Sequence, residues 1–179
     1  MINSYVNNYI VDKKYELIES EREFEDKILY RIKALKSFGD IKKGDIGGWI
    51  ESEQNLSHEG LCWVYDDAIV YENANISDNA KVKGTAVISG NAKVYENAVV
   101  SGIALVFGNA EICGNAMVFD NARVLENAIV KENAKVYESA SVYGNAQIGG
   151  CAEIYGKAKI CGNVKIEDHC KIFNNDLVV

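Results

Sequence analysis

Two histidines, His58 and His169, are the side chains of this chain best suited to act as a general base near neutral pH. A catalytic imidazole needs a partner that orients it and a pocket that receives the substrate. No inserted loop is expected to build such a pocket, because a six-residue spacing is unbroken from Cys62 to Val178. The sequence therefore predicts a capping or hydrogen-bonding role for His58 and a surface role for His169, and it keeps both as the candidates for a catalytic base.

The cysteines are the second group with chemical potential, and there are five of them without a CxxC pair. Cys62 and Cys170 occupy positions where a small, inward-facing residue is expected, and a cysteine there behaves as a compact apolar residue. Cys151, Cys170 and His169 are the possible metal ligands that lie near one another in sequence. We expect reduced thiols in the cytoplasm and no metal site.

Acidic residues recur with a fixed spacing and could be interpreted as paired carboxylates. Because they are distributed around every corner of the expected fold, we interpret them as a solvated surface. No Walker, Rossmann or nucleophile-elbow motif accompanies them, so no cofactor is expected. These residues are Glu72, Asp78, Glu96, Asp120, Glu126, Glu132, Glu138 and Asp168.

A six-residue repeat must position all of these side chains. Val or Ile occupies every sixth position from Val64 to Val178, and Ala lies two residues earlier from Ala68 to Ala158, most often preceded by Asn. This period excludes an amphipathic helix and predicts a short strand followed by a tight corner, with Gly and Asn in the left-handed backbone region. Three units close a triangular coil, so residues 62 to 179 give about six and a half coils with a rise of roughly 4.8 Å each.

One such unit is Val-Tyr-Gly-Asn-Ala-Gln at residues 142–147. It resembles the unit of the hexapeptide-repeat, trimeric-LpxA-like superfamily. The resemblance implies an all-β fold, a single-stranded left-handed β-helix over residues 61–179. The chain departs from the superfamily at the position after the aliphatic residue, where the acyltransferases favour Gly or acidic residues. Here that position holds Tyr71, Ser89, Phe107, Cys113 and Lys131.

Residues 1–60 do not follow the repeat and are expected to form an N-terminal β-rich cap. A β-helix with a bare first coil would expose unpaired strand edges. Strands are predicted near residues 9–11, 15–18 and 28–35, and the charged segment 19–26 is expected to be a hairpin loop or a helical turn. An irregular first coil is expected to begin near Trp49 and Ile50.

The stretches Lys14 to Leu17, Leu29 to Leu35, Phe38 to Glu51 and Asn55 to Ser57 resemble uncharacterised β-helical proteins of bacteria and phages, which are often labelled transferases. Enzymes of the superfamily transfer acyl groups from acyl-CoA, and loops that interrupt their coils hold the donor. The period here is unbroken from Cys62 to Val178, so no inserted loop is expected.

Outward residues one coil apart form columns. One column contains Phe119, Tyr137, Tyr155 and Phe173, and a second face contains Phe107 and Tyr143. Aromatic columns stabilise a solenoid by stacking and also mark interfaces. Leu177 and Val178 in the last coil offer a competing end-to-end contact. We expect a homo-oligomer, with a dimer favoured over a trimer.

The net charge is −7, which disfavours direct binding of nucleic acid. No apolar run is long enough to span a membrane, and secretion by a charged-apolar-small signal is not expected. The sequence therefore predicts a cytoplasmic, non-enzymatic binding or scaffold protein that self-associates and presents a rigid acidic surface to a protein partner, in its sharper form a phage- or prophage-borne protein that meets a host or defence factor. The alternative is a hexapeptide-repeat acyltransferase that uses acyl-CoA.

Overall fold

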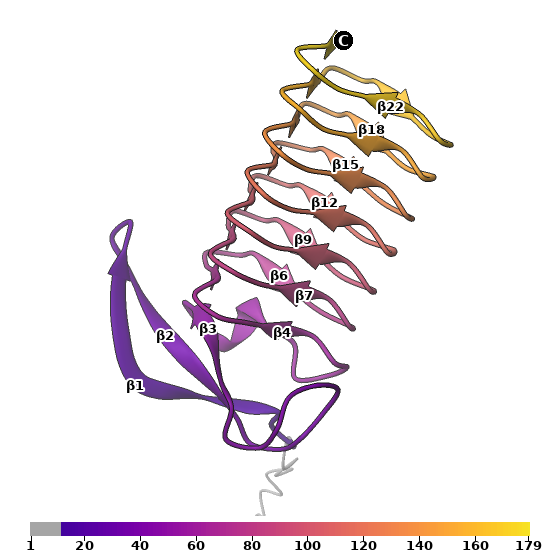
Figure 1. Ribbon diagram of the computed structural model, residues 1–179. Coiled ribbons are helices and arrows are strands. Elements are labelled where there is room, and N and C mark those ends of the chain that lie inside the picture. Colours follow the sequence, from indigo (N-terminus) through magenta and orange to yellow (C-terminus); the bar gives the residue numbers. More distant parts are fainter. Residues whose placement is uncertain (1–11) are drawn as a thin grey trace, which may run out of the picture.

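A β-solenoid makes up most of the molecule, and an antiparallel hairpin stands beside its first coils (Figure 1). The computed structural model describes residues 12–179, except for the side chain of Ser20. The strand expected at residues 9–11 lies outside the described residues. One short 3-10 helix, η1 (Glu53–Asn55), interrupts the first coil. The prediction of an all-β solenoid is confirmed.

The strands form three sheets, which we call sheets I, II and III. Sheet I contains β1 (Tyr15–Phe24), β2 (Lys27–Ala34), β3 (Ile46–Ile50), β5 (Ile69–Val70), β8 (Val87–Ile88), β11 (Leu105–Val106), β14 (Arg123–Val124), β17 (Ser141–Val142), β20 (Lys159–Ile160) and β23 (Leu177–Val178). Sheet II contains β4 (Trp63–Val64), β7 (Lys81–Val82), β10 (Val99–Val100), β13 (Met117–Val118), β16 (Lys135–Val136), β19 (Glu153–Ile154) and β22 (Lys171–Ile172). Sheet III contains β6 (Asn75–Ile76), β9 (Lys93–Val94), β12 (Glu111–Ile112), β15 (Ile129–Val130), β18 (Gln147–Ile148) and β21 (Lys165–Ile166).

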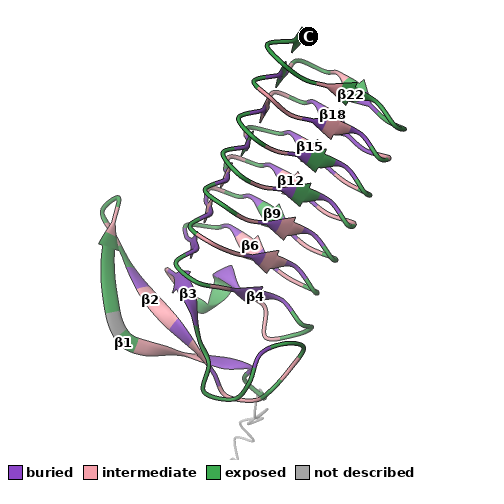
Figure 2. Ribbon diagram, in the orientation of Figure 1, coloured by how far each residue is buried: buried purple, intermediate pink, exposed green. Residues whose placement is uncertain are grey.

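The repeat builds the core directly. The aliphatic residue of each unit points inward, and those from Val64 to Ile160 are fully buried, as is every Ala from Ala68 to Ala158 (Figure 2). Successive coils are in exact eighteen-residue register, so that Val82 pairs with Val100 and Val100 with Val118. The stiff β-branched residues therefore stack on their own kind along the solenoid axis.

The corners differ from the prediction in one respect. The left-handed residue is the Gly, Asp or Glu that lies two positions before the Ala, as at Glu72 with φ 57° and Gly90 with φ 71°. The Asn that follows does not adopt a positive φ. In the last coil, Asn174 takes the place of the Gly or acidic residue and has φ 61°. The prediction that Asn fills the left-handed position is therefore wrong, and acidic residues share that position with Gly.

The hairpin of β1 and β2 extends sheet I beyond the solenoid. β2 pairs antiparallel with β3, and β3 pairs parallel with β5, so the first coil begins within this sheet. The prediction of a loop or helical turn over residues 19–26 is wrong. Most of this segment belongs to β1, and the turn is confined to Glu25 and Asp26. The hairpin tip packs its Phe24 ring edge-on against Tyr71 at 5.7 Å.

The five cysteines are free thiols. Cys62 is fully buried as predicted, whereas Cys170 is exposed, because the last described coil has a neighbouring coil on one side only. Cys170 occupies the same position of the repeat as Cys62 but is not buried there. Within residues 12–179, no helix is long and apolar enough to cross a membrane.

Candidate functional site

A cluster of polar side chains fills the end of the first coil beneath the cap. Lys14 is almost completely buried there, and its Nζ lies 3.2 Å from Cys62 Sγ and donates to the backbone oxygens of Cys62 at 2.9 Å and Glu59 at 3.2 Å. Burial lowers the pKa of the Lys14 ammonium and raises the pKa of the Cys62 thiol. This burial is not predictable from the sequence, because a single Lys before a strand is ordinarily exposed.

His58 belongs to the same cluster. Its ring stacks on Tyr15 with centroids 4.3 Å apart, and its Nδ1 accepts the backbone N–H of Lys14 at 3.3 Å. Its Nε2 lies 3.5 Å from a Glu53 carboxylate oxygen, without the geometry of a hydrogen bond. Hydrogen bonding to Lys13 lowers the pKa of Glu53. The contacts of His58 thus join the cap to the first coil.

His169 lies on an exposed corner between β21 and β22, near the C-terminal end of the solenoid (Figure 1). His58 lies between η1 and β4, at the opposite end. The structure does not bring the two histidines together. Within residues 12–179, no group of three or more His, Cys, Asp or Glu side chains has the arrangement to hold a metal ion.

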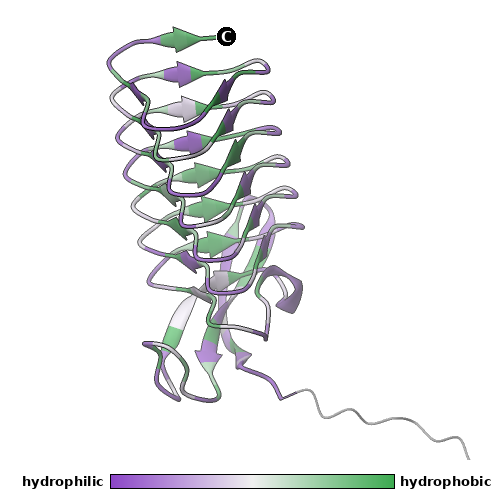
Figure 3. Cartoon of the chain, turned by 90° about the vertical axis from the view of Figure 1, so that its right-hand side faces the viewer, coloured by the Kyte–Doolittle hydropathy of each residue, from purple (hydrophilic) through white to green (hydrophobic). Residues whose placement is uncertain are grey.

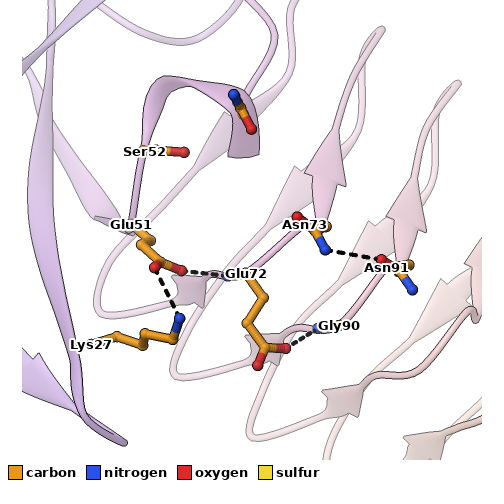
Figure 4. A pocket seen from close by; sticks show the side chains of 8 residues that line it. Lys27, Glu51, Ser52, Glu72, Asn73, Gly90 and Asn91 are labelled. Carbon is orange, nitrogen blue, oxygen red and sulfur yellow. Dashed lines mark hydrogen bonds and ion pairs between the residues drawn. The ribbon is translucent and has the colours of Figure 1, made fainter.

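The acidic corner residues form bonds that the sequence analysis missed. A groove of about 510 Å³ lies where the cap meets the solenoid. Figure 4 shows the side chains that line it. Lys27 pairs with Glu51 at 3.2 Å, Glu51 accepts the backbone N–H of Glu72 at 2.7 Å, and Glu72 accepts the backbone N–H of Gly90 at 2.7 Å. Glu72 is exposed and Glu51 is half-buried, and their carboxylates connect one coil to the next.

Asparagine side chains form a second connection at the corner between sheets I and III. Each side-chain amide donates to the side-chain oxygen of the Asn one coil further along. The bonds are 2.8 to 3.1 Å long and join Asn73, Asn91, Asn109, Asn127, Asn145 and Asn163. Figure 4 shows the first bond of this asparagine ladder. The repeat of Asn every eighteen residues was the available signal.

The aromatic column of sheet II comprises Phe119, Tyr137, Tyr155 and Phe173. Its ring centroids are 4.9, 5.0 and 5.3 Å apart, and adjacent rings are parallel to within 12°. Phe119, Tyr137 and Tyr155 are half-buried, whereas 40% of Phe173 is exposed. The rings stack face over face because the coil spacing imposes it, and their outer edges remain at the surface.

The remaining interface candidates lie elsewhere on the solenoid. Phe107 is 42% exposed on sheet I, and Tyr143 is half-buried two coils further along the same face. Leu177 is 62% exposed in β23, and its neighbour Val178 is half-buried. The structure therefore separates the candidates into the column on sheet II, a mixed face on sheet I and the C-terminal coil.

Stacked six-residue units with inward Val or Ile, buried Ala and tight corners define a hexapeptide-repeat β-solenoid. A family model described as the YdcK β-solenoid repeat matches residues 110–126. The chain is 39% identical over 82 residues to a protein of Escherichia coli strain K12 named "Uncharacterized acetyltransferase YdcK". That similarity covers 41% of this chain and 25% of the relative, so the chain matches a quarter of the relative's length.

Proposed function

We propose that this protein is a non-enzymatic scaffold that self-associates through the aromatic column of sheet II. The stacked rings Phe119, Tyr137, Tyr155 and Phe173 carry this proposal, because contiguous aromatic surface at the edge of a rigid sheet is typical of association sites. Stacking between neighbouring rings also fixes their positions before a partner arrives, which lowers the entropic cost of binding.

The acidic corners support the second part of the proposal, a rigid negative surface for a protein partner. The net charge is −7, and carboxylates such as Glu72 are fixed by hydrogen bonds to the backbone of the next coil. A rigid array of like charges favours a basic partner and accelerates its encounter. The proposal includes the cytoplasm as the location and, in its sharper form, a host or defence protein as the partner of a phage-borne factor.

Light scattering on purified protein at micromolar concentration tests the self-association. We expect the parent to be a dimer and a Tyr137→Ser/Tyr155→Ser variant to be a folded monomer. Tyr95→Ser, on sheet III, is the matched control and should remain a dimer. A monomeric parent contradicts the proposal. Dissociation of an Ile172→Asp/Val178→Asp variant, with the sheet II variant still dimeric, would move the contact to the last coils.

Acetyl transfer is the second candidate function, and the printed name of the Escherichia coli relative favours it. The chain matches a quarter of that relative, the two histidines lie at opposite ends of the solenoid, and neither lines the groove at the cap or the groove between sheets II and I. We therefore expect no saturable binding of acetyl-CoA by calorimetry. Binding that is lost in His58→Ala or His169→Ala would replace the scaffold proposal with the transferase.

A further inference from the structure

A groove of about 570 Å³ runs along the corner between sheets II and I, on the C-terminal half of the solenoid. Two outward rows of side chains form it, one on each side of the buried Ala residues. Its polar lining consists of Asn121, Arg123, Ser139, Ser141, Lys157 and Lys159. Ile103 and Leu105 close the end nearest the cap.

This lining is cationic in an acidic protein. Arg123, Lys157 and Lys159 make no ion pair with the described part of the chain, and no carboxylate lines the groove. The nearest acidic residues in sequence are Asp120 and Glu138. Their carboxylates are directed along the corner, where they accept the backbone N–H groups of Glu138 at 3.3 Å and Gly156 at 2.9 Å.

The polar groups of the groove also differ from those at the other corners. At the corner between sheets I and III, the asparagine ladder uses its own donors and acceptors. Within residues 12–179, the side chains of Asn121, Ser139 and Ser141 make no such bonds. Their donors are therefore free to meet a ligand, together with the guanidinium and the two ammonium groups.

The shape of the groove follows from residue size. Ser141 lies in register between Arg123 on one neighbouring strand and Lys159 on the other. The short serine forms a notch between two long cationic side chains, whose backbones are about 9.6 Å apart, or twice the strand spacing. Hydropathy changes from strand to strand along sheet I. Towards the C-terminal end, β20 and β14 are hydrophilic, whereas β11, β8 and β5, nearer the cap, are hydrophobic (Figure 3).

We propose that this notch binds a phosphate-type oxyanion, either free or carried by a small molecule. A guanidinium supplies paired N–H donors that match phosphate oxygens, and the lysines add point charges from the opposite side. The hydroxyl groups of Ser139 and Ser141 add further donors. Together these groups offer more hydrogen-bond donors than a single carboxylate ligand can accept, which favours phosphate. Ile103 and Leu105 would contact the apolar part of a phosphate ester. This site is independent of the self-association proposed above.

Calorimetry or phosphorus NMR with inorganic phosphate and phenyl phosphate tests the site on the full chain. We expect saturable binding at about 1 mM or below. Arg123→Ser/Lys159→Ser, which extends the serine row, should weaken binding at least tenfold. Lys43→Ser/Lys135→Ser removes the same charge elsewhere and should leave binding unchanged. Ser141→Asp introduces a carboxylate into the notch and should also weaken phosphate binding. It provides a second test if the double variant does not fold.

The two probes also separate the sources of the phosphate group. Tighter binding of phenyl phosphate would assign the groove to an ester, and equal binding would assign it to the free ion. The proposal is overturned if phosphate does not saturate the parent, or if the control variant loses as much affinity as Arg123→Ser/Lys159→Ser. It is also overturned if citrate binds as tightly as phosphate, because the notch would then be a general anion surface.

Discussion

The carboxylate of Glu72 accepts a hydrogen bond of 2.7 Å from the backbone N–H of Gly90, the equivalent residue of the next coil (Figure 4). Both residues have a positive φ, which costs a non-glycine residue roughly 1 kcal/mol or more. A hydrogen bond to a charged acceptor is worth about as much. The acidic residue therefore tolerates the left-handed corner because its side chain connects two coils.

Glu72→Ala should lower the free energy of unfolding by about 1 to 2 kcal/mol, because it removes the hydrogen bond and keeps the unfavourable backbone. Glu72→Gly also loses the bond but relieves the left-handed conformation, so its cost should be smaller. Urea denaturation of the two variants measures the difference. If the glycine variant is the less stable of the two, the strain at this corner does not have the assigned origin.

Asn109 lies in the middle of the asparagine ladder, where it accepts from Asn91 and donates to Asn127 at 2.9 Å each. Asn109→Ala should lower the unfolding free energy by about 1 to 2 kcal/mol, since two bonds are lost. Asn121→Ala is the matched control, at a corner position without a ladder, and should stay within about 0.5 kcal/mol. Equal denaturation midpoints for the two variants would show that the ladder adds no stability.

The core of the solenoid was predictable because an inward position restricts its own residue type. Val118 must be apolar and Ala116 must be small, whatever residues lie on the outer surface. The hydrogen bonds at the corners were harder to predict. The bond from the Gly90 N–H to the Glu72 carboxylate joins residues eighteen positions apart and depends on the direction of a side chain. The cap was partly missed for a different reason. β1 is charged over residues 19–23 because sheet I continues there beyond the core, so that the strand lacks an alternating apolar pattern.

Only one of the candidate sites is predictable from the sequence. The aromatic column follows from the eighteen-residue register alone, since Tyr137 and Tyr155 must then stack. The cationic groove does not follow from the register. Its distinguishing feature is that Arg123 and Lys159 have no ion-pair partner within residues 12–179, and the sequence does not show which charges are paired.

Ala116 is fully buried at a corner of the core. Ala116→Leu should overpack one coil and lower the unfolding free energy by about 1 to 3 kcal/mol. Met117→Leu is the control: the side chain is 37% exposed, and the substitution nearly conserves volume. Thermal unfolding followed by circular dichroism measures both, and an unchanged melting temperature for Ala116→Leu would contradict the inward assignment.

Tyr137 provides a prediction about pH. Burial in the aromatic column and the negative charge of Glu153, which lies 3.3 Å from the phenol, raise its pKa to about 12. Because this value exceeds the ordinary 10.0, the folded state retains a proton that the unfolded state releases between those two values. The contribution of Tyr137 to stability is therefore complete below pH 10 and is lost as the pH rises towards about 12.

Ultraviolet absorbance titrations of the parent and of Tyr137→Phe give the ionisation of this one tyrosine as their difference. We expect a midpoint near 12 in the parent and a lower midpoint in Glu153→Gln, which keeps the contact and removes the charge. Glu111→Gln is the matched control, because Glu111 lies 3.4 Å from Tyr95 in the same arrangement on sheet III. It should leave the Tyr137 midpoint unchanged. A Tyr137 midpoint near 10 in the parent would show that the aromatic column is open to water, and it would weaken the case for a preformed association surface on sheet II.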